Sequence, residues 1–281
     1  MCAGCRSGYP ARMPQRFHDY DRVAIVTGSD SGIGEATAIA LAGAGFDVGV
    51  TYRSDDGGAQ EVAAKVRDAG RRCEVRQLDL VRLPGSAGVI DDLADALGGL
   101  GVLVNCAGTG ISTPVVDTSW DEWREVLAVD LDGPFLCAQR AARRMLATGR
   151  GGRIINVTSV HEHAPRVGAG AYCAAKGGLG LLTKVLAQEL AAAGITVNAV
   201  APGEIATAMT GNEDVDPHTV ARPGIPAGRP GDANEVAAVI AMLASPEAAY
   251  VTGASWAVDG GMLLMGPQAG SHLDSDDWRD G

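Results

Sequence analysis

Short apolar segments alternate with longer, helix-like segments along almost the whole chain. The expected strands are residues 23–27, 48–52, 73–77, 102–106, 153–158, 196–200 and 255–258. Helices are expected between them at about 33–44, 57–69, 86–97, 120–148, 172–193 and 232–243, several of which are rich in Ala, Leu, Glu and Arg. Strands and helices that alternate in this way predict a parallel sheet with helices on both faces.

The apolar runs are continuous rather than alternating. "VLVNC" (102–106) and "RIINVT" (153–158) are typical of strands that are covered on both sides. Right-handed crossovers then make the sheet doubly wound. With 281 residues, 46% of them hydrophobic, the chain suits one large core. We expect a single-domain α/β protein with a Rossmann-like parallel sheet of about seven strands over residues 21–265.

Both ends of the chain are expected to lie outside this domain. Residues 1–20 have the composition of a disordered extension, of which 1–12 are expected to be dispensable, and residues 266–281 form a tail with Trp278 as its one apolar anchor. The first twenty residues contain no apolar stretch of the signal-peptide kind, and no apolar run reaches membrane-spanning length. We therefore expect a cytoplasmic protein that does not enter a membrane.

Charge and cysteine usage narrow the partners. The net charge of −11 argues against a nucleic-acid or anionic-membrane surface and favours a small-molecule partner. The six cysteines, at 2, 5, 73, 106, 137 and 173, lack the grouping of metal ligands. We expect buried, reduced thiols and no metal site; a redox or metal role for Cys2 and Cys5 is the alternative, and it would need partner ligands in a segment that is expected to be disordered.

Polar or glycine-rich stretches follow six of the expected strands. They read "TGSDSGIG", "RSDDGG", "LDL", "NCAG", "TSVHEH" and "APGEIAT" in chain order. In an open parallel sheet the carboxyl ends of the strands meet at one edge, where ligands bind. Candidate chemistry should therefore gather there.

The first of these stretches is suited to phosphate. It places Gly28, Gly32 and Gly34, with Ser31 and Ile33, between a strand and a helix. Amides at the helix N-terminus can face a pyrophosphate, and the absent side chains allow a close approach. Three residues separate the first two glycines, unlike the G-x-G-x-x-G spacing.

A phenol and an ammonium lie one helical turn apart, at Tyr172 and Lys176. Free tyrosine ionises near pH 10, too high for a ready base at neutral pH, and a nearby cation favours the phenolate. Ser159, thirteen residues earlier and just beyond a strand, could donate to a substrate oxygen. On its own, the Tyr/Lys spacing is usually an aromatic ring beside a solvated amine, and Ser159 a polar strand end.

Taken together, the glycine turn, "NCAG" and Tyr-x-x-x-Lys resemble the short-chain dehydrogenase/reductase family in its short form, over residues 22–265. The resemblance implies that Ser159, Tyr172 and Lys176 are catalytic. It also implies that Lys176 holds the nicotinamide ribose. The other residues it places around the cofactor are Asp79, Leu80, Asn105, Ala107, Gly108, Pro202, Gly203, Ile205 and Thr207.

Cofactor preference depends on the end of the second strand. An Asp or Glu there would bond the ribose hydroxyls of NAD, whereas this chain has Arg53 and Ser54. A guanidinium and a hydroxyl suit a 2′-phosphate, so we expect NADP. The alternatives are a solvated Arg53, or Asp55 or Asp56 accepting NAD.

The family's usual fourth catalytic residue, an asparagine, is replaced by Asp130 in "AVDLDGPF". We expect Asp130 to hold the relay water or to pair with Lys176 and change the titration of the group. A hydrogen bond at a helix kink is the structural alternative.

Two loops are expected at the substrate. His161, in "SVHEH", is a candidate substrate contact; with Glu162 and His163 it lacks a third metal ligand of suitable spacing. Residues 208–230 are rich in Gly and Pro and are expected to form a mobile lid.

The function that these residues predict is hydride transfer between NADP(H) and a sugar, polyol or other small alcohol or ketone. "YRS", "SVHE" and "YVTGASWAVDGGM" are similar to bacterial glucose-type sugar dehydrogenases. A 3-oxoacyl-carrier-protein reductase is the main alternative, and a non-catalytic nucleotide sensor is a lesser one. Enoyl reduction is disfavoured because relatives with that activity space the tyrosine and lysine by six residues. The resemblance also implies a homodimer or homotetramer built on the helices at 120–148 and 172–193.

Overall fold

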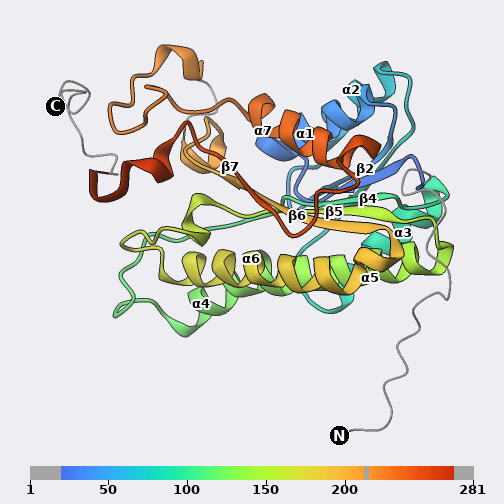
Figure 1. Ribbon diagram of the computed structural model, residues 1–281, viewed down its shortest axis with the longest axis horizontal. Helices are drawn as coiled ribbons and strands as arrows, with labels where there is room; N and C mark the ends of the chain where they lie inside the picture. Colours follow the sequence, from blue (N-terminus) through green and yellow to red (C-terminus); the bar gives the residue numbers. More distant parts are fainter. Residues whose placement is uncertain (1–19, 212–214, 269–281) are drawn as a thin grey trace, which may run out of the picture.

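A seven-stranded parallel sheet lies between two layers of helices (Figure 1). The computed structural model describes residues 20–211 and 215–268. The strand order is β3-β2-β1-β4-β5-β6-β7, and each neighbouring pair is parallel. The strands are β1 (Val23–Val26), β2 (Asp47–Tyr52), β3 (Cys73–Gln77), β4 (Val102–Asn105), β5 (Gly152–Val157), β6 (Ile195–Pro202) and β7 (Ser255–Val258). The expected doubly wound α/β fold is confirmed.

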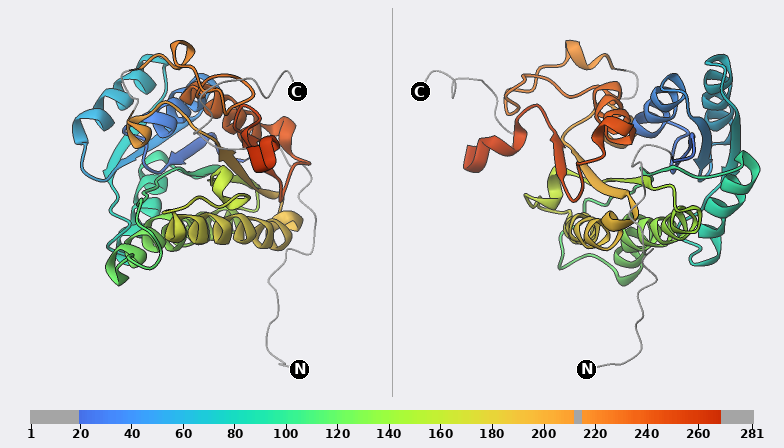
Figure 2. Two further views of the ribbon diagram at one scale, coloured as in Figure 1. Left: turned by 90° about the vertical axis from the view of Figure 1, so that its left-hand side faces the viewer. Right: turned by 45° about the vertical axis from the view of Figure 1, so that its right-hand side comes forward.

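Two layers of helices cover the two faces of the sheet, as Figures 1 and 2 show. One face carries α1 (Gly32–Gly43), α2 (Asp56–Asp68) and α7 (Ala233–Ala244). The opposite face carries α3 (Val89–Leu97), α5 (Gly133–Thr148) and α6 (Gly170–Leu190), with α4 (Trp120–Leu127) beside α6.

The central strands contribute side chains to two hydrophobic cores, one on each face of the sheet. In β4, Val102 and Val104 pack in the core beneath α1 and α7, whereas Leu103 between them packs toward α3 and α5. Successive side chains of a strand point to opposite faces. Because both faces are covered, every position must be apolar, which explains why these runs show no alternation in the sequence.

The expected helix at 120–148 is interrupted. The structure has α4, a π-helical segment at Ala128–Asp132, and then α5, so the prediction of one continuous helix is wrong. Pro134 has no N–H and cannot close the usual helical bond to the carbonyl of Asp130. The N–H of Gly133 bonds instead to the carbonyl of Ala128, five residues back.

The N-terminal boundary also differs from the expectation by one residue. Tyr20, assigned to the extension, is buried and donates its hydroxyl proton to the carbonyl of Ala244. Its ring stacks on Phe46 and lies under the guanidinium of Arg153. The expected extension at 1–19, with Cys2 and Cys5, and the tail anchor Trp278 lie outside the described residues.

The double-sided core predicts a large cost for removing one central side chain. Leu103 is fully buried, so Leu103→Ala should lower the free energy of unfolding by about 2–5 kcal/mol. Leu264→Ala makes the same chemical change at a position that is 87% exposed and should alter it by less than about 0.5 kcal/mol. Urea denaturation compares the two; equal losses would contradict this account of the core.

Candidate active site

A cavity of about 330 Å³ opens where β1, β4, β5 and β6 end. Most of the predicted site residues line it. From the predicted cofactor set these are Gly28, Ser31, Gly32, Ile33, Gly34, Arg53, Leu80, Ala107, Gly108, Pro202, Gly203, Ile205 and Thr207, and Ser159, Tyr172 and Lys176 join them. The glycine turn and the Ser/Tyr/Lys group therefore share one cavity.

Glycine in this turn allows a close approach between neighbouring backbone segments. Gly28 has a φ of +59°, and a Cβ there would lie 2.7 Å from Cα of Ala107. A Cβ on Gly34 would lie 2.0 Å from the carbonyl oxygen of Gly28. No side chain caps the start of α1 at Ser31, so the first-turn amides remain available to an anion. This cradle fits a dinucleotide pyrophosphate.

Two threonines fix the turn against its neighbours. The hydroxyl of Thr27 accepts hydrogen bonds from the N–H groups of Cys106 and Ala107, each at 3.0 Å. The hydroxyl of Thr51 accepts the N–H of Gly28, also at 3.0 Å. The ends of β1, β2 and β4 are thus tied together around the cavity.

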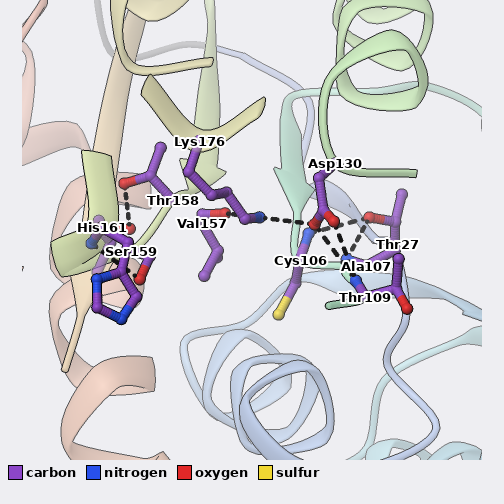
Figure 3. A network of polar contacts seen from close by, with 11 residues as sticks. Thr27, Cys106, Ala107, Thr109, Asp130, Val157, Thr158, Ser159, His161 and Lys176 are labelled. Atoms are coloured by element: carbon purple, nitrogen blue, oxygen red, sulfur yellow. Dashed lines mark hydrogen bonds and ion pairs between the residues drawn. The ribbon is translucent and has the colours of Figure 1, made fainter. Parts of the chain in front are cut away.

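The catalytic candidates lie on β5 and α6. Ser159 follows β5, and its hydroxyl accepts the N–H of His161 at 3.1 Å. Tyr172 and Lys176 are in the first two turns of α6, with Nζ of Lys176 at 5.5 Å from the centre of the Tyr172 ring. That Nζ donates to the carbonyl of Val157 at 3.0 Å, which ties α6 to the end of β5 (Figure 3).

Asp130 lies directly behind this group and is fully buried. Its Oδ1 is 3.1 Å from Nζ of Lys176, so it forms a direct ion pair, one of the two expected arrangements (Figure 3). Both carboxylate oxygens also accept the N–H of Thr109, at 3.3 Å. The π-helical segment brings this carboxylate beneath the cavity, whose lining it does not itself reach.

Burial and charge oppose each other here. Burial lowers the pKa of Lys176, but the charges of Asp130 and Tyr172 oppose it, and the pKa lies above its usual value. Burial raises the pKa of Asp130, although the ammonium and the Thr109 N–H counteract it. Burial also raises the pKa of the Cys106 thiol to about 12, so this cavity-lining cysteine stays protonated at neutral pH.

The comparisons with known proteins agree with this geometry. A family model described as "Enoyl-(Acyl carrier protein) reductase" matches residues 28–263. The uncharacterized oxidoreductase YohF of Escherichia coli is 51% identical over 247 residues, which are 88% of this chain and 98% of that one. The chain belongs to the short-chain dehydrogenase/reductase family. It is an NAD(P)-dependent oxidoreductase acting on CH–OH groups, and the expected family is confirmed.

Solved structures of short-chain dehydrogenases share the fold. The crystal structure of acetoin dehydrogenase YohF from Salmonella typhimurium is 49% identical, with a TM-score of 0.83 over 91% of this chain and 99% of that one. A putative 2-deoxy-d-gluconate 3-dehydrogenase from Agrobacterium tumefaciens, solved with bound NADP, is 35% identical, with a TM-score of 0.78 over 89% of this chain and 99% of that one.

Some predicted site residues of this dehydrogenase do not line the cavity. Asn105 is buried, and its amide donates to Asn156 at 2.9 Å and to the Pro134 carbonyl at 3.2 Å. Ser54 is exposed outside the cavity. His161 lies beside the cavity, its ring edge-on to Tyr172 at 6.3 Å between centroids.

Arg53 lines the cavity and is held by acidic neighbours. Its Nη2 is 3.2 Å from Glu125 and its Nε is 3.8 Å from Asp79. Asp79, predicted beside the adenine, does not line the cavity and also pairs with Arg82 at 3.2 Å. The guanidinium is thus kept at the rim by exposed ion pairs, which are individually weak and can yield to a ligand.

Ala208, Met209 and Thr210, from the start of the expected lid, also line the cavity. The sequence analysis did not assign a role to eight further cavity-lining residues: Asp30, Tyr52, Leu78, Cys106, Thr109, Val129, Val157 and Thr158. Several of them lie in or beside motifs that were identified. Cys106 is part of "NCAG", which Thr109 follows directly, and Thr158 begins "TSVHEH". Val129 comes from the π-helical segment and precedes Asp130 in "AVDLDGPF".

Residues 208–230, the expected lid, are tied at both ends. Backbone bonds join Ala206 and Gly231 at 3.0 Å, and Arg222 pairs with Glu204 at 2.6 Å. Near the far end, Arg229 pairs with Glu235 at the start of α7 at 2.7 Å. The segment packs on the turn after β7, where the Ala227 N–H bonds to the Gly260 carbonyl (Figure 1).

Within residues 20–211 and 215–268, no group of three or more His, Cys, Asp or Glu side chains is placed to hold a metal ion. No helix in these ranges has the length and apolar character to cross a membrane.

The Arg229–Glu235 pair predicts a pH-dependent stability. The hydrogen bond from Arg229 and the N–H of Asp232 lower the pKa of Glu235 to about 2 from its usual 4.5. The pair should therefore stabilise the fold fully above pH 4.5 and be lost as the pH falls toward 2. Above pH 4.5 the wild type should melt at a higher temperature than Glu235→Gln. This difference in melting temperature should decrease as the pH is lowered from 4.5 to 2.

Glu61 is an exposed carboxylate on α2, so Glu61→Gln is the control for the loss of one negative charge. The difference in melting temperature between wild type and Glu61→Gln should not decrease in the same way between pH 4.5 and pH 2. A wild type whose advantage over Glu235→Gln persists unchanged to pH 2 would contradict the assignment.

Proposed function

We propose that this enzyme transfers a hydride between NADP(H) and a small alcohol or ketone, with Tyr172 as the general acid and base. The observation that carries the proposal is the cavity itself, which Ser159, Tyr172 and Lys176 line together with the glycine turn and the start of α1. A proton donor and a dinucleotide cradle are thereby brought to one space, as coupled hydride and proton transfer requires.

The chain's own residues handle the proton. In the oxidation direction, the Tyr172 phenolate takes the proton from the substrate hydroxyl, and the Ser159 hydroxyl donates a hydrogen bond to the substrate oxygen. The Lys176 ammonium stabilises the phenolate by its charge. A bound dinucleotide would supply the acceptor for the hydride, which leaves the substrate carbon that bears this oxygen. In reduction, Tyr172 returns the proton to the alkoxide oxygen.

Nucleotide contacts follow the cavity walls. The turn from Gly28 to Gly34 and the amides at the start of α1 would hold the pyrophosphate. Leu80, Ala107 and Gly108 would border the adenosine side, and Ile205 and Thr207 the nicotinamide side. Asp79 and Asn105 support this wall from behind, since Asp79 contacts Arg53 and Asn105 is buried below it.

For the substrate, we propose a small hydroxyketone or diketone before a sugar. The 49% identity to a protein described as acetoin dehydrogenase exceeds the 37% identity to a glucose 1-dehydrogenase, which weakens the sugar hypothesis. Substrate would sit between Ser159, Tyr172 and Met209, beneath residues 208–230, with His161 at the edge. A 3-oxoacyl-carrier-protein substrate remains the second candidate, because it uses the same residues. A non-catalytic nucleotide sensor is disfavoured by the presence of both Tyr172 and Lys176.

We further propose a cytoplasmic homodimer or homotetramer. Large apolar side chains are exposed on the helices that the resemblance places at an interface, including Trp120 at 70% and Leu181 at 65%. Helix faces of this kind are typical of surfaces that are covered by a second copy.

Tyr172→Phe should lower kcat by about 10²- to 10⁴-fold without abolishing NADP binding, because only the proton donor is lost. Nicotinamide absorbance is followed with acetoin, butane-2,3-dione, sugars, polyols and a 3-oxoacyl thioester. Tyr250→Phe, at a fully exposed tyrosine, is the control and should leave kcat unchanged. Wild-type cofactor binding without turnover on any of these would support the sensor instead.

Arg53→Ala should lower the ratio of kcat/KM for NADP to that for NAD by about 10- to 100-fold, the loss expected for one charge-assisted contact to the 2′-phosphate. Arg82→Ala removes the other arginine that pairs with Asp79, outside the cavity, and should change the ratio little. An NADP preference that survives Arg53→Ala would assign the phosphate to another residue.

A further inference from the structure

The carboxylate of Asp130 makes three polar contacts in a fully buried position. Oδ1 contacts Nζ of Lys176 at 3.1 Å, and the Thr109 N–H is 3.3 Å from each oxygen. The Lys176 side chain is only 4% exposed, and its one other hydrogen bond among the described residues is to the Val157 carbonyl. A buried charge of this kind requires a partner, and Asp130 supplies it.

Asp130 also changes the electrostatic potential at the Tyr172 hydroxyl. The groups that face the ammonium are Asp130 from the π-helical segment, Tyr172 from its own helix and the Cys106 thiol from the end of β4. Asp30, in the glycine turn, acts on Cys106 in the same region. Asp130 is the only one of these in an ion pair with Lys176, so its carboxylate offsets part of the positive charge that the ammonium presents to the phenol.

We propose that Asp130 is a positioning residue that fixes the Lys176 ammonium and partly cancels its charge toward Tyr172, and so sets the pH range in which the enzyme works. The inference rests on the proposed role of Tyr172 and deepens it. An asparagine at this position would keep a similar shape and hydrogen-bond acceptor but would leave the ammonium uncompensated.

The direction of the effect follows from electrostatics. Removing a nearby anion favours proton loss from every neighbouring group, so the phenolate should form at lower pH in Asp130→Asn. The acidic limb of the kcat/KM profile for alcohol oxidation should move toward acid by on the order of one pH unit. A phenolate that forms at lower pH is also a weaker base. On the alkaline plateau, kcat of Asp130→Asn should therefore be lower than that of the wild type.

The experiment measures that limb in wild type, Asp130→Asn, Asp130→Ser and Asp130→Glu. The two uncharged variants should both shift toward acid, which keeps the test usable if one of them folds poorly. Asp130→Glu keeps the charge and should shift least. Asp132→Asn makes the same charge change two residues away, at a partly exposed side chain, and should leave the profile unchanged.

An optical titration separates this inference from the proposed function. The ultraviolet tyrosinate signal that is lost in Tyr172→Phe should rise at lower pH in Asp130→Asn than in wild type, whether or not any substrate is turned over. A shifted signal in an enzyme that turns over no substrate would overturn the function and keep the ion-pair inference. The opposite result is an active enzyme in which wild type and Asp130→Asn have the same pH profile of kcat/KM and the same tyrosinate titration. That result would overturn the inference and keep the proposed function.

Discussion

Parallel pairing of all seven strands is the constraint from which the site follows. Because the strands run the same way, the turn after β1, the "NCAG" turn after β4 and Ser159 after β5 all emerge at one edge. Right-handed crossovers put α1 and α6 on opposite faces of the sheet. The start of one helix can then face a phosphate while the other delivers a phenol and an ammonium to the same cavity.

Short polar bonds between strand ends hold this arrangement together. Thr27 accepts two backbone N–H groups from the end of β4, and Thr51 accepts one from the glycine turn. Lys176 bonds back to the carbonyl of Val157, so the helix that carries Tyr172 is tied to the strand that precedes Ser159. The strand ends around the cavity are thus tied to one another, and residues 207–210 of the irregular segment after β6 line the same cavity.

The sequence predicted the fold well because its strongest signals are local. The continuous apolar runs, the glycine turn between strand and helix and the Tyr172/Lys176 spacing each depend on few neighbouring residues, and the structure has all of them where they were expected. The helix at 120–148 was predicted wrongly because its composition favours helix throughout, whereas one missing N–H at Pro134 decides the geometry. The roles of Asn105 and Arg53 depend on partners far along the chain, Asn156 and Glu125, which no local pattern reveals.

The π-helical segment connects a backbone defect to the acid–base chemistry of the site. It contributes Val129 to the cavity wall and Asp130 to the space beneath it, so both depend on a helix that fails to continue regularly through Pro134. Any evolutionary change that smoothed this helix would rotate the carboxylate away from its counter-ion. If Asp130 acts as we propose, a change in the regularity of this helix would also change the working pH of the enzyme.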